Sequence, residues 1–397
     1  MQQSLSEKRP RIEVVDALRG FAVMAILVVH SIEHFIFPVY PDPANCPQWL
    51  NVLDQGVFGV IFGLFAGKSY SIFALLFGFT FFIQYNNRQQ KGDDFGYRFL
   101  WRLLLLAGFA TINAAFFPAG DVLLLYAIVG ITLFIVRKSS NKVVFVIAII
   151  LLLQPVEWFH YIASIINPSY TLPNLGVGEM YAEVAEYTKE GNFWKFIIGN
   201  VTLGQKASLM WAVGAGRYFQ TAGLFMIGML IGRKGLFIST KENIRFWIKV
   251  LIVSAILFNP LYWLKVQLLD NANSEIIKQS AGVVLDMWQK FAFTFVLVSS
   301  FVLLYQTNKF QKLTSSLKVY GKMSLSNYIT QSMFGALIYF PFGLYLAPYT
   351  GYTLSLFIGI AIFFIQLQFC KWWLTRFKHG PFETIWHKLT WIKIGKS

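Results

Sequence analysis

The sequence predicts an all-α, polytopic integral membrane protein with about ten transmembrane helices and with both termini in the cytoplasm. Of its 397 residues, 56% are hydrophobic and only 13% are charged, whereas soluble domains carry about 25% charged residues. Apolar stretches of about 20 residues, long enough to cross the hydrocarbon core of a bilayer, recur along the whole chain. Because these stretches are continuous rather than alternating, they favour helices over membrane-spanning strands.

Ten of these stretches account for the predicted helices. We expect spans near residues 16–37, 68–85, 99–117, 121–137, 142–164, 208–232, 246–264, 284–306, 324–345 and 352–373. Residues 50–66 are also apolar, and three placements stay open for them: they lie in the interface, re-enter the membrane, or lengthen the second span.

One connection between the spans is long. Residues 165–206 are predicted to lie outside the membrane, and a helix-like pattern runs through them. Phe193, Trp194 and Phe196 are placed to anchor an amphipathic helix in the outer interface. A structured connector is the alternative for this loop.

Positive charge orients the predicted spans. The segments assigned to the inside hold 25 of the 34 lysine and arginine residues, and the segments assigned to the outside hold 5. This asymmetry follows the positive-inside rule and predicts cytoplasmic termini. The net charge of +15 is therefore explained by topology, and we expect no nucleic-acid partner.

The whole chain, residues 1–397, is expected to form a single transmembrane domain. It comprises a cytoplasmic tail (1–15), a helical bundle (16–373) and a cytoplasmic interfacial segment (374–397). The interfacial segment is predicted to contain an amphipathic helix, because its large apolar residues recur at helical spacing: Phe382, Ile385, Trp386 and Leu389.

The sequence predicts neither processing nor a metal site. The first apolar run follows basic residues, as in a signal peptide, but it continues without a small-residue cleavage site. Cys46 and Cys370 fall on opposite faces of the predicted membrane, so no disulfide is expected. No group of residues has the spacing of metal ligands.

Five ionisable residues lie on one face of the first predicted helix: Asp16, Arg19, His30, Glu33 and His34. At ~3.6 residues per turn, Arg19 and His30 are roughly 20° apart around the axis and about 16 Å apart along it. Ionisable groups inside a bilayer are unfavourable by ~3 kcal/mol or more and usually face a bundle interior or a wet cavity. We therefore expect a polar path across the membrane; the alternative is a simple charge pair at the helix start and a structural histidine.

Four further polar residues are candidates for binding a substrate. Arg217 is surrounded by small and apolar residues, and a buried arginine needs a carboxylate partner or an anionic ligand. Lys68 either binds substrate or extends to the interface. Asn327 and Gln331 lie four residues apart on one face, where they either join helices or form a polar wall of a substrate cavity.

Several of these residues carry a resemblance to known families. The arginine and histidine of RGFAVMAILVVH, separated by ten residues, resemble the signature of the acyltransferase-3 family of integral-membrane O-acyltransferases. The wider pattern is more similar to the YeiB-like family of uncharacterised bacterial membrane proteins, with a C-terminal region at about 223–395. The matching pieces are DALRGFAVMAIL, GKSYSIFALLFGFTFFIQ, GLFMIGMLIGRKGLF, YGKMSLSNYITQS and GPFETIWHKLTW.

The YeiB-like family more distantly resembles the heparan-glucosaminide acetyltransferase group, which transfers acetyl from cytosolic acetyl-CoA to a luminal sugar. Lys68 corresponds to a fixed position of the family. Family members often have asparagine where this chain has His30, so the family does not require that imidazole.

This resemblance implies a transmembrane acyltransferase that moves an acyl group, such as acetyl, from cytosolic acyl-CoA to an extracytoplasmic envelope glycan or lipid. His30 is the expected general base or acyl carrier. Glu33 or Asp54 would orient it, and His34 is its possible replacement. Acyl-CoA would be a co-substrate, and no tightly bound cofactor is expected.

Inner-face basic residues, including Arg19, Arg98 and Arg102, would hold the phosphates of the donor. Two other functions stay open: a transporter for a small anionic or amphiphilic solute anchored at Arg217, and a non-catalytic membrane scaffold. The expected location is the bacterial cytoplasmic membrane. The expected partners are the lipid bilayer and a small-molecule, glycan or lipid acceptor; the sequence carries no signal for the oligomeric state.

Overall fold

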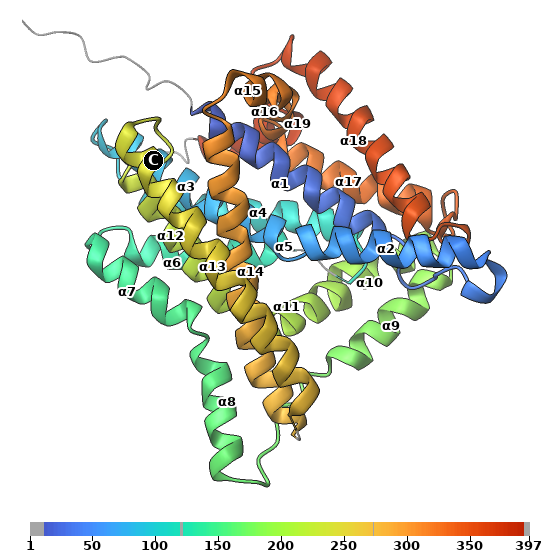
Figure 1. The fold of residues 1–397 in the computed structure, drawn as a ribbon. Helices are drawn as coiled ribbons and strands as arrows, with labels where there is room; N and C mark the ends of the chain where they lie inside the picture. Colours follow the sequence, from blue (N-terminus) through green and yellow to red (C-terminus); the bar gives the residue numbers. More distant parts are fainter. Residues whose placement is uncertain (1–11, 120–121, 273, 393–397) are drawn as a thin grey trace, which may run out of the picture.

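The computed structural model describes residues 12–119, 122–272 and 274–392, and this part of the chain contains helices and no strand (Figure 1). Most of the predicted tail 1–15 therefore lies outside the described residues. Six helical segments are long and apolar enough to cross a membrane: α1 (Glu13–Ile32), the near-continuous α2 (Gln48–Phe65) and α3 (Lys68–Gln89), α4 (Gly96–Ala115), α13 (Lys241–Asn271), α14 (Glu275–Leu304) and α18 (Tyr352–Leu374). The chain is therefore a helical, multi-pass membrane protein.

Four of the ten predicted spans correspond to shorter or interrupted helices. They are α5 (Val122–Val129) with α6 (Ile131–Val136), α7 (Asn141–Leu152) with α8 (Pro155–Ile166), α11 (Gln205–Gly214) with α12 (Arg217–Arg233), and α17 (Ser324–Tyr339). The pair α7 and α8 is bent by 44° and is a seventh span if it is counted as one. The predicted count of ten and the orientation of the termini stay predictions.

Smaller helices fill the connections: α9 (Val177–Lys189), α10 (Phe193–Gly199), α15 (Asn308–Leu313), α16 (Ser315–Gly321) and α19 (Pro381–Thr390). Short 3-10 turns lie at Pro43–Asn45 and Ala347–Tyr349, and a π-helical stretch at Asn200–Gly204 joins α10 directly to α11. The loop 165–206 thus contains two helices rather than one. Phe196 is buried against Phe340, with ring centroids 5.0 Å apart, while Trp194 is 69% exposed. The loop is therefore packed onto the bundle as a structured connector.

Helices α3 and α12 pack closely against each other, backbone to backbone. A Cβ added at Gly78 would collide with the backbone of Phe225, and one added at Gly228 would collide with the backbone of Leu75. Small residues let membrane helices approach to this distance. This contact fixes the position of the two helices relative to each other, and both run from it back to the cavity of the candidate site.

Helix α19 is held at one end of the bundle by Arg98, Arg102 and Glu383. Arg98 donates to the carbonyl of Thr390 at 3.0 Å, and the guanidinium of Arg102 lies 4.3 Å from the Trp386 ring centroid. Glu383 accepts hydrogen bonds from the backbone N–H groups of Leu325 and Ser326, at 2.7 and 3.1 Å, at the start of α17. The two arginines expected to bind donor phosphates therefore anchor this helix.

Candidate functional site

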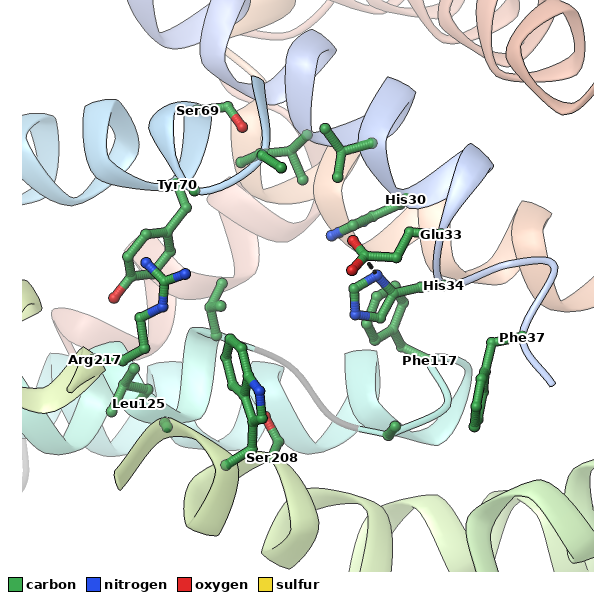
Figure 2. A pocket seen from close by; sticks show the side chains of 18 of the residues that line it. His30, Glu33, His34, Phe37, Ser69, Tyr70, Phe117, Leu125, Ser208 and Arg217 are labelled. Atoms are coloured by element: carbon green, nitrogen blue, oxygen red, sulfur yellow. Dashed lines mark ion pairs between the residues drawn. The ribbon is translucent and has the colours of Figure 1, made fainter. Parts of the chain in front are cut away.

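A cavity of 560 Å³ lies inside the bundle, within the ~300–1,000 Å³ typical of small-molecule sites. The end of α1, the break between α2 and α3, and helices α5, α9, α11, α12 and α14 contribute to its wall. Figure 2 shows Arg217 and Tyr70 on one side of this space and His30, Glu33 and His34 on the other. The two sides differ in charge: one holds a carboxylate between two imidazoles, and the other holds a guanidinium.

The first side, which we call the imidazole end, consists of His30, Glu33 and His34. The two imidazoles lie with centroids 5.3 Å apart, and both contact the ring of Phe117, at 4.7 and 4.9 Å. Oε2 of Glu33 lies 3.3 Å from Nδ1 of His34 (dashed in Figure 2). Nδ1 of His30 is buried and has no hydrogen-bond partner in the described part of the chain. The structure thus brings together three of the residues that the sequence predicted for chemistry.

Arg217 lies on the second side and is the first residue of α12. It is only 8% exposed. Its Nη1 donates to Oε1 of Gln220 at 2.8 Å, and its guanidinium lies 5.4 and 5.5 Å from the ring centroids of Tyr70 and Trp211. Within the described ranges, these contacting partners of Arg217 are all neutral, and Glu33 across the cavity interacts with it only at longer range.

Three lysines lie near Arg217, and two of them share a single carboxylate. Asp286 accepts from the ammonium groups of Lys265 and Lys290, each at 2.6 Å. Lys68 donates to the carbonyl of Gly63 at 2.7 Å and does not line the cavity, although it interacts electrostatically with the other three cations. We call Arg217, Lys68, Lys265 and Lys290, together with Asp286, the cation cluster. Its formal charge is +3, from four cations and one carboxylate.

The cation cluster separates the main cavity from a second, smaller one. The second cavity has a volume of 300 Å³ and shares Trp211, Arg217 and Lys290 with the first. Lys265 and Asp286 line only the second. Asp286 is not among the residues predicted from the sequence. It lies four residues before Lys290 inside an apolar run, and residues with this spacing share a helix face, so the pair could have been found.

The cytoplasmic half of the predicted polar path is not part of this site. Arg19 is bonded to Asp16 at 3.2 Å and to the hydroxyl of Thr80 at 2.9 Å, and neither Arg19 nor Asp16 lines the cavity. Between them and the imidazole end, Ala22 and Ile26 are buried among apolar neighbours. The expected continuous path is therefore corrected to two separate polar groups on one helix, because apolar packing of α1 interrupts it.

Asn327, Gln331 and Asp54 also lie away from the cavity. Asn327 donates to the carbonyl of Tyr320 at 2.9 Å, and Gln331 donates to the hydroxyl of the same tyrosine at 3.1 Å. Both side chains thus join helices, which was one of the two interpretations of their spacing. Asp54 accepts from the backbone N–H of Thr353 at 2.8 Å and does not orient an imidazole.

Comparisons with known proteins agree with the resemblance to YeiB-like proteins. Residues 231–393 match the family described as "Protein of unknown function (DUF418)". The chain is 24% identical to the uncharacterized protein YxaH of Bacillus subtilis (strain 168), over 99% of this chain and 96% of YxaH. It is 25% identical to the uncharacterized protein YeiB of Escherichia coli (strain K12), over 95% of each. No solved structure matches the chain. The chain is therefore similar over nearly its whole length to YeiB-like proteins of unknown function, and its C-terminal part carries the DUF418 match.

Proposed function

We propose that this protein is a membrane-embedded acyltransferase of the bacterial cytoplasmic membrane. It would transfer an acetyl-type group from cytosolic acyl-CoA to an extracytoplasmic glycan or lipid that enters the cavity. The observation that carries the proposal is the contact of Glu33 with His34, beside His30, in a cavity within the bundle. Acyl transfer is proposed as the reaction because the spacing of Arg19 and His30 resembles the signature of acyltransferase-3 proteins.

His34 is the best-placed general base in this arrangement. Glu33 contacts its Nδ1, which leaves Nε2 for the hydroxyl or amine of the acceptor. The separation of 3.3 Å is slightly longer than the ~2.6–3.2 Å of a catalytic hydrogen bond, and such contacts often shorten when substrate binds. His30 has no comparable carboxylate partner and would bind the polar group of the acceptor. The geometry therefore favours His34 over His30 as the base.

The reaction proceeds as a base-assisted acyl transfer. His34 takes the proton of the acceptor while the acceptor's oxygen or nitrogen attacks the thioester carbonyl of the donor. The carbon–sulfur bond then breaks, the acyl group stays on the acceptor, and the CoA thiolate leaves with the proton held by the imidazole. Base catalysis of this kind contributes about 10²–10⁴-fold to the rate. Acyl-CoA must reach the cavity past Ala22 and Ile26, so this face of α1 has to separate from its neighbours during turnover.

The test is transfer of radiolabelled acetyl from acetyl-CoA by inverted membrane vesicles that contain the full-length protein. We expect label in the envelope glycan or lipid fraction, and we expect His34→Gln and Glu33→Gln to lower the rate at least tenfold. His379→Gln, which removes a histidine outside the cavity, is the matched control. The proposal fails if the wild-type protein labels no fraction, or if His34→Gln and His30→Gln both keep the wild-type rate.

A transporter for a small anionic or amphiphilic solute is the second candidate, and a specific observation favours it. Two helices are interrupted at the cavity, α2/α3 at Gly67 and α11/α12 at Gly216. Interrupted helices whose ends face a central site are typical of secondary transporters. Counterflow of a labelled anion through proteoliposomes, without any covalent change of the anion, would distinguish transport from acyl transfer.

A further inference from the structure

We propose that the cation cluster binds the phosphate group of an amphiphilic substrate, which Arg217, Lys290 and the first turns of α3 and α12 would hold together. The inference names the substrate class of the cavity to which we assign acyl transfer. It rests on the proposed function only in that phosphate binding and acyl transfer are placed in the same cavity. Phosphate binding itself does not require acyl transfer.

Arg217 provides the first argument, because its charge is buried without an anion. Its exposed fraction is 8%, and its side-chain contacts in the described ranges are an amide oxygen, a thioether sulfur and two aromatic rings. A buried ionic group is strongly unfavourable unless it is paired, and an arginine fork fits phosphate oxygens in a bidentate manner. An anion in the cavity would supply the missing charge.

The neighbouring cations provide the second argument. Asp286 neutralises at most one of the two lysines that it contacts, Lys265 and Lys290. Lys68 is bonded to a neutral carbonyl, and the nearest other carboxylate of the cavity, Glu33, contacts His34. Even when Glu33 is included, four cations face two carboxylates, which leaves a formal charge of +2. A phosphate with one or two negative charges matches this excess.

The third argument comes from two helix starts that converge on the same place. Gly67 precedes α3 and Gly216 precedes α12, both with left-handed φ angles, of 75° and 63°, and neither helix has a side-chain cap. A Cβ added at Gly67 would lie 2.9 Å from Cδ of Lys290 and 3.6 Å from Nη2 of Arg217, so α3 begins directly against the cations. The first N–H groups of a helix and its dipole favour bound phosphate.

Carbonyl groups at the end of α2 lie close to the start of α3 and could weaken its attraction for phosphate. The carbonyls of Gly63 and Phe65, at the end of α2, accept from the ammonium of Lys68 and the hydroxyl of Ser69, at 2.7 and 2.9 Å. Their partial negative charge is thereby compensated within the break. The positive character of the start of α3 is left for the cavity.

The remaining wall of the cavity explains why the substrate should be amphiphilic. Large apolar side chains also line the cavity: Phe37, Phe62, Val122, Leu125 and Trp211. The carboxylate of Glu33, on the opposite side, is negatively charged when ionised and would repel an anion there. The phosphate would therefore lie at Arg217, and the acceptor group of the same molecule would reach His34.

The chemistry is shared by two sources, a lipid head group and a soluble phosphate compound, and calorimetry with two probes distinguishes them. The full-length protein in a neutral detergent, in phosphate-free buffer, is titrated with inorganic phosphate and with short-chain phosphatidic acid. Dioctanoylglycerol serves as the uncharged control ligand. Binding of inorganic phosphate supports a soluble phosphate compound, and binding of phosphatidic acid alone supports a lipid head group.

Variants determine whether the binding occurs at the cation cluster. Arg217→Gln should weaken binding about ten- to a hundredfold, the loss expected for one charge-assisted hydrogen bond. Lys195→Gln removes the same charge from an exposed ion pair and should change nothing. If Arg217→Gln fails to fold, Lys290→Gln replaces it in the test. His34→Gln should retain binding, so that loss of acyl transfer with intact binding refutes only the proposed function.

The inference is overturned if the folded wild-type protein binds neither probe at millimolar concentration. It is equally overturned if Arg217→Gln and Lys290→Gln, both folded, bind phosphate or phosphatidic acid as tightly as the wild-type protein does.

Discussion

Replacing Gly78 by alanine would test how α3 and α12 hold the two helix starts at the cavity. The added Cβ would collide with three atoms of the Phe225 backbone, its carbonyl oxygen, carbonyl carbon and Cα. None of these atoms can rotate away, so the helices must separate. Overpacking of this kind destabilises by about 1–3 kcal/mol. Because alanine also favours the helix over glycine by ~1 kcal/mol, we expect a net loss of about 0–2 kcal/mol.

Alanine substitutions at two other glycines should destabilise the protein less than Gly78→Ala does. A Cβ at Gly232 would meet only the ring of Phe82, which can move, and a Cβ at Gly108 would meet nothing within 4 Å. Gly232→Ala should therefore be less destabilising than Gly78→Ala, and Gly108→Ala should be neutral or stabilise by up to ~1 kcal/mol.

The assay is reversible unfolding of the purified variants in mixed micelles, followed by phosphate calorimetry on those that remain folded. Gly78→Ala should weaken phosphate binding, since it displaces the starts of α3 and α12 relative to each other. A Gly78→Ala protein as stable as Gly108→Ala would refute the close backbone contact, and with it our account of how the cavity is built.

Three further predictions concern the site, the C-terminal helix and the topology. Arg217→Lys should weaken phosphate binding in calorimetry almost as much as Arg217→Gln, because a point ammonium does not replace a planar bidentate donor; wild-type affinity in the lysine variant would contradict this. Burial raises the pKa of Glu383 above its ordinary 4.5, while hydrogen bonds from Ser326 act against the rise. The folded state therefore binds the proton of Glu383 more tightly than the unfolded state does. Protonated Glu383 thus contributes to the free energy of unfolding, and this contribution declines as pH rises above about 4.5. Glu383→Gln should flatten that part of the stability profile, measured by thermal unfolding between pH 4 and pH 8; an unchanged slope would assign it to other groups. Reporter fusions should place residue 392 in the cytoplasm and loop 165–206 outside, and an external C-terminus would overturn the charge-based map.

The class of the protein and part of its site could be predicted from the sequence alone. Long apolar stretches are a local property, so each of the six qualifying segments overlaps a predicted span. The stripe of His30, Glu33 and His34 is also local, since the helical repeat brings residues three and four apart onto one face. Arg217 was identified because a charge among apolar residues needs a partner, whatever the fold.

Only the tertiary structure decided which polar residues belong together. Arg19 and Gln331 looked like site residues, but their partners, Thr80 and Tyr320, come from other helices and remove them from the cavity. Four predicted spans correspond to short or interrupted helices, because hydropathy does not register a break such as Gly216, where one helix stops and a new one starts. Which helix starts face one another depends on the packing of α3 against α12, a contact between distant parts of the chain. Hydropathy and residue spacing describe one segment at a time. The placement of Arg217 and His34 on opposite sides of one cavity depends instead on packing between segments.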